Sequence, residues 1–209
     1  MLTVDNIIKP SNEMFGETIK RLKLFGLIPL NYSDSGWKNG NGCDPIYHIG
    51  NEDLKTIANL FANGQTIWLD YLKISLECTA PLYFWDDLEM HSKGADDFHG
   101  EELLDKPFTR DDFSLEEIPD NVVDIIVETL NTVRKQYFKN PTEENRKETL
   151  AKLLTLLPLS YNVRKSFVIS YEDAAKIILS KRKDKFKEWR QLANELIMLP
   201  YMYTIVGGD

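Results

Sequence analysis

Two stretches of the chain alternate between apolar and polar residues, which is the pattern of a β-strand with one buried face. The first, 71–79, alternates Leu72, Ile74, Leu76 and Cys78 with Lys73, Ser75, Glu77 and Thr79. The second, 163–169, places Val163, Lys165, Phe167 and Ile169 on one side and Arg164, Ser166 and Val168 on the other. We therefore expect two half-buried strands, one in each half of the chain.

Apolar residues recur at helical spacing elsewhere, and capping residues mark the ends of these stretches. Helices are expected over 11–25, over 52–63 with Asn51 as cap, from Pro81 through Trp85, over 120–138, from Thr142 to Pro158, after Ser170, and over 185–198. Gly26 and Gly64 end the first two, because glycine accepts the left-handed backbone that follows a helix. Asp173 lies three residues after Ser170, which is typical of a capping box.

Two long segments show no periodicity. Residues 31–50 are rich in Gly, Asn, Asp and Ser, and we interpret them as a long loop. Residues 86–119 are acidic and are expected to be irregular. Because strands and helices follow one another without regular alternation, we expect an α+β fold with an antiparallel or mixed sheet packed against helices. The length of 209 residues and the absence of a linker favour a single domain spanning 1–209.

Composition excludes several classes of protein. The hydrophobic fraction of 43% is too high for a disordered chain, and no apolar run approaches the roughly 18 residues of a membrane span. Two cysteines, Cys43 and Cys78, are too few for a disulfide scaffold or a four-thiolate zinc site. Residues 1–14 lack the layout of a signal peptide. We therefore expect a soluble, cytoplasmic protein.

The formal net charge of −8 is unevenly distributed along the chain. Residues 86–124 hold fourteen acidic and three basic residues, a net charge of −11, and the rest of the chain carries +3. Residues 134–190 hold fifteen basic and seven acidic residues. Either the two regions pack together or they form separate acidic and basic surfaces. Because the bases interleave with acids, we do not expect nucleic acid as a partner, whereas an acidic surface favours a basic protein partner.

Groups that can hold a metal crowd into 91–102. They are His91, Asp96, Asp97, His99, Glu101 and Glu102. Their spacing matches no helical ligand pair, so we expect no metal site, and a pH-sensitive surface is the alternative. The chain also lacks a phosphate-binding Gly-rich loop and a nucleophile elbow. We therefore assign no catalytic residue.

Arg164 is the cation of greatest interest, because it stands on the polar side of a predicted strand. It is either an ordinary exposed arginine or an anion contact, since a guanidinium group pairs bidentately with phosphate or carboxylate. The aromatic run Tyr83, Phe84 and Trp85 is better suited to a helix packed into the core than to base stacking.

Two segments, taken in order, match the arrangement of a known enzyme family. Residues 64–85, GQTIWLDYLKISLECTAPLYFW, align without gaps with a block written GH.TPFEH…F…AP.F. Residues 153–182, LLTLLPLSYNVRKSFVISYEDAAKIILSKR, follow a pattern LPL…R…W…NARSL…LR that runs helix, proline, strand, helix. Both patterns belong to the flavin-dependent thymidylate synthases, so the chain resembles the ThyX family.

The resemblance implies a homotetrameric α+β protein. In that family FAD and dUMP bind at subunit interfaces, and a folate and a nicotinamide cofactor complete the reaction. The flavin carries the hydride, while the protein orients the uracil ring and holds the phosphates.

Most family site residues are replaced in this chain. The signature R-H-R-x(7)-S-x-R would fall on Met90, His91, Ser92, Gly100 and Glu102, and only His91 matches. The arginine before the signature falls on Asp86, and the asparagine and arginine of NARSL fall on Ser170 and Glu172. Arg164 matches an arginine of the C-terminal block, and Lys181, or Arg182 beside it, keeps a positive charge at the end of that block.

The loss of arginines argues against nucleotide chemistry. A carboxylate beside a phosphate costs several kcal/mol, where an arginine contributes about 1.5–3 kcal/mol. We therefore expect a ThyX-like protein of the uncharacterised phage or prophage kind that no longer makes thymidylate and acts by binding a protein partner or a small ligand. The residues expected to bind a ligand are His91, Arg164, Ser170, Lys181 and Arg182. We expect a homo-oligomer and no cofactor, with FAD the one cofactor that the resemblance leaves open.

Two alternatives remain at this point. The first is a flavin- or nucleotide-dependent enzyme, a transferase or an oxidoreductase, whose chemistry changed in a remodelled pocket. The second is an unrelated acidic α+β domain whose proline-containing blocks match by accident.

Overall fold

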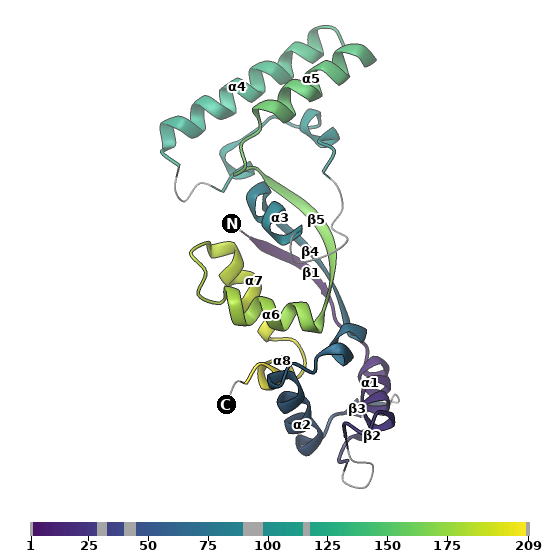
Figure 1. Ribbon diagram of the computed structural model, residues 1–209. Helices are drawn as coiled ribbons and strands as arrows, with labels where there is room; N and C mark the ends of the chain where they lie inside the picture. Colours follow the sequence, from purple (N-terminus) through teal and green to yellow (C-terminus); the bar gives the residue numbers. More distant parts are fainter. Residues whose placement is uncertain (1, 29–32, 40–44, 90–97, 115–117, 208–209) are drawn as a thin grey trace.

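The computed structural model describes residues 2–28, 33–39, 45–89, 98–114 and 118–207. Its elements in chain order are β1 (Thr3–Ile8), α1 (Asn12–Leu24), β2 (Gly36–Asn39), β3 (Pro45–His48), α2 (Asn51–Ala62), the 3₁₀ helix η1 (Ile67–Tyr71), β4 (Lys73–Pro81), α3 (Leu82–Glu89), the 3₁₀ helices η2 (Glu101–Leu104) and η3 (Arg110–Asp112), α4 (Asp120–Lys139), α5 (Glu143–Leu156), β5 (Asn162–Ser170), α6 (Tyr171–Lys181), α7 (Lys187–Ile197) and α8 (Met202–Ile205). They form one elongated α+β domain, in which the pair α4–α5 projects from one end and α1, α2 and β2–β3 form the other (Figure 1).

The centre of the molecule is an antiparallel sheet with strand order β1-β4-β5. Thr79 pairs with Arg164 on β5 and with Thr3 on β1. The register of β1 shifts between Val4 and Asn6, so Asp5 is the extra residue of a bulge. Both strands predicted from alternation are confirmed, with the expected residues buried and exposed. The edge strand β1 was not predicted.

Helices α3, α6 and α7 cover one face of this sheet (Figure 1). The indole Nε1 of Trp85 on α3 donates hydrogen bonds of 3.1 Å to the carbonyl oxygens of Ala80 and Val163, which ties the helix to both strands. Phe84 packs against Trp189 of α7 with ring centroids 4.9 Å apart. The predicted core role of Phe84 and Trp85 is confirmed, whereas Tyr83 is only half-buried.

The α4–α5 pair packs against the part of the acidic segment that includes η2 and η3. Asn131 and Phe108 exchange two hydrogen bonds, of 2.9 and 2.8 Å, between the side-chain amide and the backbone. The Arg134 guanidinium donates to the Leu104 carbonyl oxygen at 2.9 and 3.2 Å. The expectation of an irregular segment over 86–119 is therefore corrected in part, because η2 and η3 order it against these helices.

The expectation of a long loop over 31–50 is wrong for its described residues. β2 and β3 form an antiparallel hairpin, with Trp37 opposite Tyr47. The hairpin lies against α1, where a Cβ atom on Gly16 would stand 3.1 Å from the Tyr47 ring. These strands have four residues each and no clean alternation, so the sequence pattern conceals them.

One of two helix caps predicted from the sequence is confirmed, and the other is wrong. The capping box of Ser170 and Asp173 is present as predicted. Asn51, expected as the cap of α2, is instead its first residue, after Gly50. The carboxylate of Asp34 accepts hydrogen bonds from the backbone N–H groups of Glu52 and Asp53 at 3.0 and 3.1 Å, and the hydrogen bond from Glu52 is the main reason that the pKa of Asp34 is lowered. A distant side chain thus supplies the cap.

Some predicted boundaries shift by two residues. Tyr71 belongs to η1 instead of the strand, and β4 runs on to Pro81, which was expected to open the helix. The last long helix begins at Lys187 instead of 185.

Candidate functional site

Arg164 lies on the open face of the sheet, with 61% of its side chain exposed. Its Nε lies 3.0 Å from an oxygen of Glu77 and 3.5 Å from an oxygen of Asp5. The Thr79 hydroxyl donates a 3.0 Å hydrogen bond to the same oxygen of Asp5. One cation thus faces two carboxylates, contributed by strands β1 and β4. The group carries a net negative charge, so its arginine is already engaged by anions from its own chain.

Ser170 is the N-cap residue of α6 and Glu172 lies in its first turn, and both stabilise the start of this helix. The Ser170 hydroxyl is buried and donates a 2.7 Å hydrogen bond to Asp173. Glu172 accepts a hydrogen bond of 2.8 Å from Thr66 and an ion pair of 2.5 Å from Lys176. Burial alone would raise the pKa of the Glu172 carboxyl, but the hydrogen bonds from Lys176 and Thr66 lower it overall. The two residues therefore have partners within the fold.

Lys181 ends α6 in a half-buried network. Its ammonium group lies 3.1 Å from an oxygen of Asp87 and 3.4 Å from an oxygen of Asp184, and 18% of the side chain is exposed. It also stands over the Trp189 ring, whose Nε1 donates a 2.6 Å hydrogen bond to Asp87. Arg182, the C-cap residue, lines a separate cavity of about 310 Å³ near α8.

Within one chain these predicted ligand residues do not converge. Ser170 and Lys181 stand at opposite ends of α6, about 16 Å apart along its axis. Arg164 is six residues before Ser170 on β5, about 20 Å away along the strand. His91 lies outside the described residues. A common site for these residues would have to be assembled between copies of the chain.

Three positions where the resemblance places conserved family groups have their own structural setting. Asp86 is exposed on α3 and Glu102 is exposed on η2. Gly100, at the place of the family's serine, has a φ of 71°, and a Cβ atom there would lie 2.7 Å from Leu154. A side chain at position 100 is therefore opposed by the backbone conformation, and the exposed side chain of Leu154 on α5 would have to shift to admit it.

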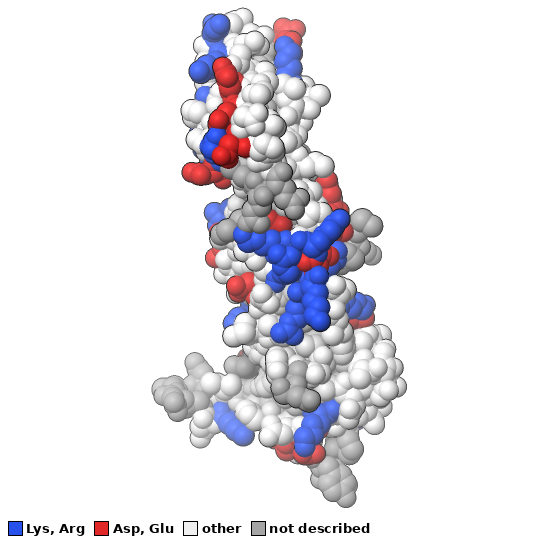
Figure 2. Space-filling model, turned by 90° about the vertical axis from the view of Figure 1, so that its left-hand side faces the viewer, with Lys and Arg blue, Asp and Glu red and all other residues white. Residues whose placement is uncertain are grey.

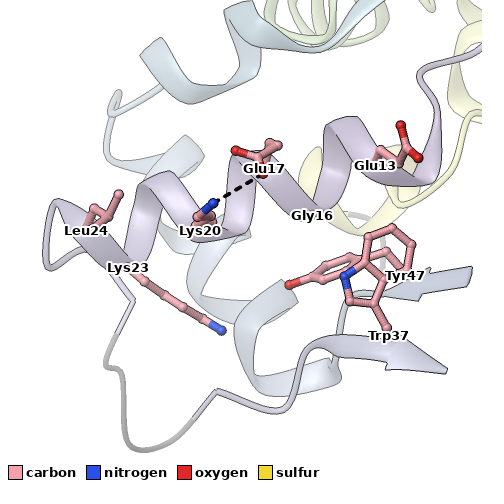
Figure 3. A pocket seen from close by; sticks show the side chains of 8 residues that line it. All are labelled: Glu13, Gly16, Glu17, Lys20, Lys23, Leu24, Trp37 and Tyr47. Carbon is pink, nitrogen blue, oxygen red and sulfur yellow. Dashed lines mark hydrogen bonds and ion pairs between the residues drawn. The ribbon is translucent and has the colours of Figure 1, made fainter. Parts of the chain in front are cut away.

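A cavity of about 730 Å³ lies between α1 and the β2–β3 hairpin. Figure 3 shows Trp37 and Tyr47 on one side of it and Glu17, Lys20 and Lys23 on the helix above. The rings of Trp37 and Tyr47 meet edge to face at 5.3 Å. Glu17 and Lys20 form an ion pair of 3.5 Å (Figure 3). Charges of both signs line this cavity, so it favours no single class of ligand.

A basic surface on α6 and α7 is the feature that sequence reasoning missed. Figure 2 shows Lys and Arg side chains gathered midway along the molecule, over these two helices. Residues 181–190 contribute Lys181, Arg182, Lys183, Lys185, Lys187 and Arg190, against Asp184 and Glu188. The signal for this surface in the sequence is the short run of basic residues at 181–190, which the acids of the broader region 134–190 dilute.

The described residues contain neither a cluster of metal-binding side chains nor a membrane-spanning helix. Within the described ranges, no three His, Cys, Asp or Glu side chains are grouped so that they could hold a metal ion. Of the crowded residues predicted from 91–102, His91, Asp96 and Asp97 fall outside those ranges. Among the described helices, none is long and apolar enough to cross a bilayer.

Comparison with known proteins identifies the fold. No family model and no curated protein matches the sequence. Two crystal structures of the flavin-dependent thymidylate synthase ThyX from Helicobacter pylori, each with FAD and dUMP, match this chain with a TM-score of 0.62. They are 15% identical to this chain, and the matches cover 98% of it and 96% and 95% of theirs.

The chain has the ThyX fold. This likeness spans nearly the whole length of both proteins, which confirms the fold that was expected from two short blocks. At 15% identity it establishes the architecture alone, and the chemistry has to be argued from this chain's own residues.

Proposed function

We propose that this chain is a ThyX-like protein of the phage or prophage kind that does not make thymidylate and instead works by binding. The observation that carries the proposal is the engagement of Arg164 by Asp5 and Glu77. The Helicobacter pylori proteins are complexed with FAD and dUMP, both of which carry phosphate. A phosphate arriving at Arg164 would meet two carboxylates as well as the arginine, and like charges at such distances repel.

The other aligned positions support the same conclusion. Glu172, at the place of the family's arginine, is paired with Lys176 in the first turn of α6. Asp86 and Glu102 also carry negative charge where the resemblance expects arginine. Gly100 has no hydroxyl to offer to a uracil ring, and its backbone disfavours a serine. Each change removes a contact to an anionic nucleotide or adds repulsion.

Two kinds of partner follow from the surface of the molecule. Asp86, Glu102, Asp105 and Asp111 are exposed and form no ion pair within the described residues, so the acidic segment 86–124 is suited to a basic protein partner. A small ligand is the other candidate. We also propose a homo-oligomer, a tetramer if assembly follows the ThyX family, which light scattering can measure.

The test is the visible spectrum of the purified protein, combined with mass spectrometry of whatever copurifies. We expect a colourless protein and no thymidylate formed from dUMP in the presence of FAD, a folate and a nicotinamide cofactor. A yellow protein with flavin absorption bands would support the runner-up, a flavin- or nucleotide-dependent enzyme with altered chemistry. Thymidylate formation would overturn both.

A further inference from the structure

The loop between α6 and α7 presents three cationic side chains to solvent. Arg182, Lys183 and Lys185 are exposed, and none of them forms an ion pair within the described residues. Figure 2 shows Lys and Arg side chains gathered over this part of the molecule. The loop is therefore a cationic surface that the described part of the chain does not neutralise.

The two acids in and beside this loop are used by the fold. Asp184 lies 3.4 Å from the ammonium group of Lys181 and accepts a 2.9 Å hydrogen bond from the backbone N–H of Phe186. Glu188, in the first turn of α7, is only 4% exposed. Neither carboxylate pairs with the exposed cations of the loop, so their positive charge is left for a partner.

An apolar hollow adjoins these cations. A cavity of about 310 Å³ is lined by Arg182 and Lys183 together with Leu179, Ile197 and Tyr203. Leu179 is 60% exposed and Tyr203 is 48% exposed. Protein interfaces combine apolar contacts that exclude water with a polar and charged rim. The loop and the hollow together therefore have the composition of a protein-binding surface.

The described part of the acidic segment 86–124 offers a complementary surface. Glu102 and Asp105 are exposed and form no ion pair within the described residues. They lie three residues apart at η2, so they share one side of a helix that has three residues per turn. The two described bases of the segment, Lys106 and Arg110, pair with other carboxylates at 2.7 Å. The acids at η2 therefore keep their negative charge toward solvent.

Within one chain the acidic and basic regions are joined at few points. Between 86–124 and 134–190, the ion pairs among the described residues are those of Asp87 with Lys181 and of Glu101 with Arg146. The first of these is half-buried between helices, and the second is a long contact of 3.8 Å. The uneven charge of the sequence thus forms separate surfaces of opposite sign, which are complementary to each other.

We propose that the α6–α7 loop of one copy docks against the acidic surface at η2 of a second copy. The inference names the partner surface in the proposed homo-oligomer and rests on that proposal. Two copies aligned antiparallel make the contact twice, once in each direction, which closes the pair. A nucleic acid is less suited to the loop, because its phosphates would be repelled by the unpaired acids of a chain with a net charge of −8.

Sedimentation velocity of charge-reversed variants tests this contact, at about 0.1 M salt, where the Debye length is about 10 Å. Lys183→Glu with Lys185→Glu should weaken self-association about tenfold or more, because like charges then face each other. Glu102→Lys with Asp105→Lys should weaken it to a similar extent. An equimolar mixture of the two reversed proteins should associate as tightly as the wild type, since each reversed surface then meets its opposite.

The matched control is Lys135→Glu with Lys147→Glu, two exposed lysines on α4 and α5. It changes the net charge by the same amount as reversal of the loop and should leave self-association unchanged. Melting temperature shows whether each variant is folded. Lys183→Gln with Lys185→Gln replaces the reversed loop if that protein is unfolded, and it should weaken association less strongly but in the same direction.

The outcomes separate this contact from the oligomer itself. Self-association that persists in both reversed variants would overturn the contact and leave the proposed homo-oligomer standing. A mixture of reversed proteins that stays dissociated, or a control that dissociates as much as the reversed loop, would also overturn the contact. A wild-type protein that is monomeric at every concentration would contradict both the contact and the homo-oligomer.

Discussion

The open face of the sheet and the α6–α7 side of the molecule both pair cations with carboxylates, yet the pairs have different consequences. On the sheet, Arg164 is mostly exposed, so its contacts with Asp5 and Glu77 stabilise the fold little but neutralise the arginine. At the end of α6, Lys181 is mostly buried and shares Asp87 with Trp189. The contacts of Arg164 therefore determine whether this arginine can bind an anionic ligand. The contacts of Asp87 with Lys181 and Trp189 determine how well α3, α6 and α7 stay packed together.

The largest expected effect is at Asp87. Asp87→Ala should lower the free energy of unfolding by about 2–3 kcal/mol, because the buried indole N–H of Trp189 and the ammonium group of Lys181 both lose an acceptor. Chemical denaturation measures this. Asp86→Ala, the exposed neighbour, is the control and should change stability by less than about 0.5 kcal/mol. Equal effects in the two variants would remove the contrast between the regions.

Position 100 tests whether the family's serine can be restored. Gly100→Ser should destabilise the protein by about 1–2 kcal/mol from its positive φ, with a small further loss because the exposed Leu154 side chain has to shift. Gly64→Ser is the matched control, since Gly64 has a φ of 75° but nothing within 4 Å of a Cβ atom. The difference in unfolding midpoint between the two variants isolates the packing effect, and a fully stable Gly100→Ser would contradict our account of this position.

Glu172 gives a smaller, pH-dependent effect. Its pKa is lowered below the ordinary value of 4.5, so its contribution is complete above that pH and is lost as the pH falls through the folded-state pKa. Glu172→Gln should cost about 0.5–1 kcal/mol at pH 7 through the lost ion pair with Lys176. Denaturation of the two proteins between pH 7 and pH 3 should show the gap closing in acid. A difference in the free energy of unfolding that widens in acid would contradict the lowered pKa of Glu172.

The smallest effect is expected at Arg164. Because its ion pairs are exposed, Arg164→Ala should change the free energy of unfolding by less than about 1 kcal/mol. Glu77→Gln should have an effect of similar size. Urea denaturation of both variants measures this, and a loss of 2 kcal/mol or more would mean that the open face is structural after all.

The fold could be predicted from the sequence where apolar and polar residues alternate along a strand or where a side chain caps a helix. β4, β5 and the capping box of Ser170 follow from local patterns, since burial of one face and the satisfaction of first-turn N–H groups depend on neighbours in sequence. β1 was missed because Asp5 and Asn6 interrupt its alternation at a bulge. The cap of α2 was assigned to the wrong residue because its true acceptor, Asp34, comes from a separate segment.

The candidate site was less predictable, for a related reason. The sequence indicated that Arg164 would face outward on a strand, and it does. Its partner Asp5 is brought near only by the pairing of β1 with β4, which no local pattern shows. Likewise, Asp87, the partner of Lys181, lies on α3 and is brought to α6 and α7 only by the packing of these helices.

The central claim is that Asp5 and Glu77 form ion pairs with Arg164, the cation that a nucleotide phosphate would need to bind. The most direct measurement is the melting temperature of the wild type and of the variant with Asp5→Asn and Glu77→Gln, each titrated with dUMP. A ligand that binds the native state raises the melting temperature with concentration. We predict no rise for the wild type, because Asp5 and Glu77 engage Arg164, and a rise in the double variant alone would assign the block to these two carboxylates. A concentration-dependent rise in the wild type would contradict the account.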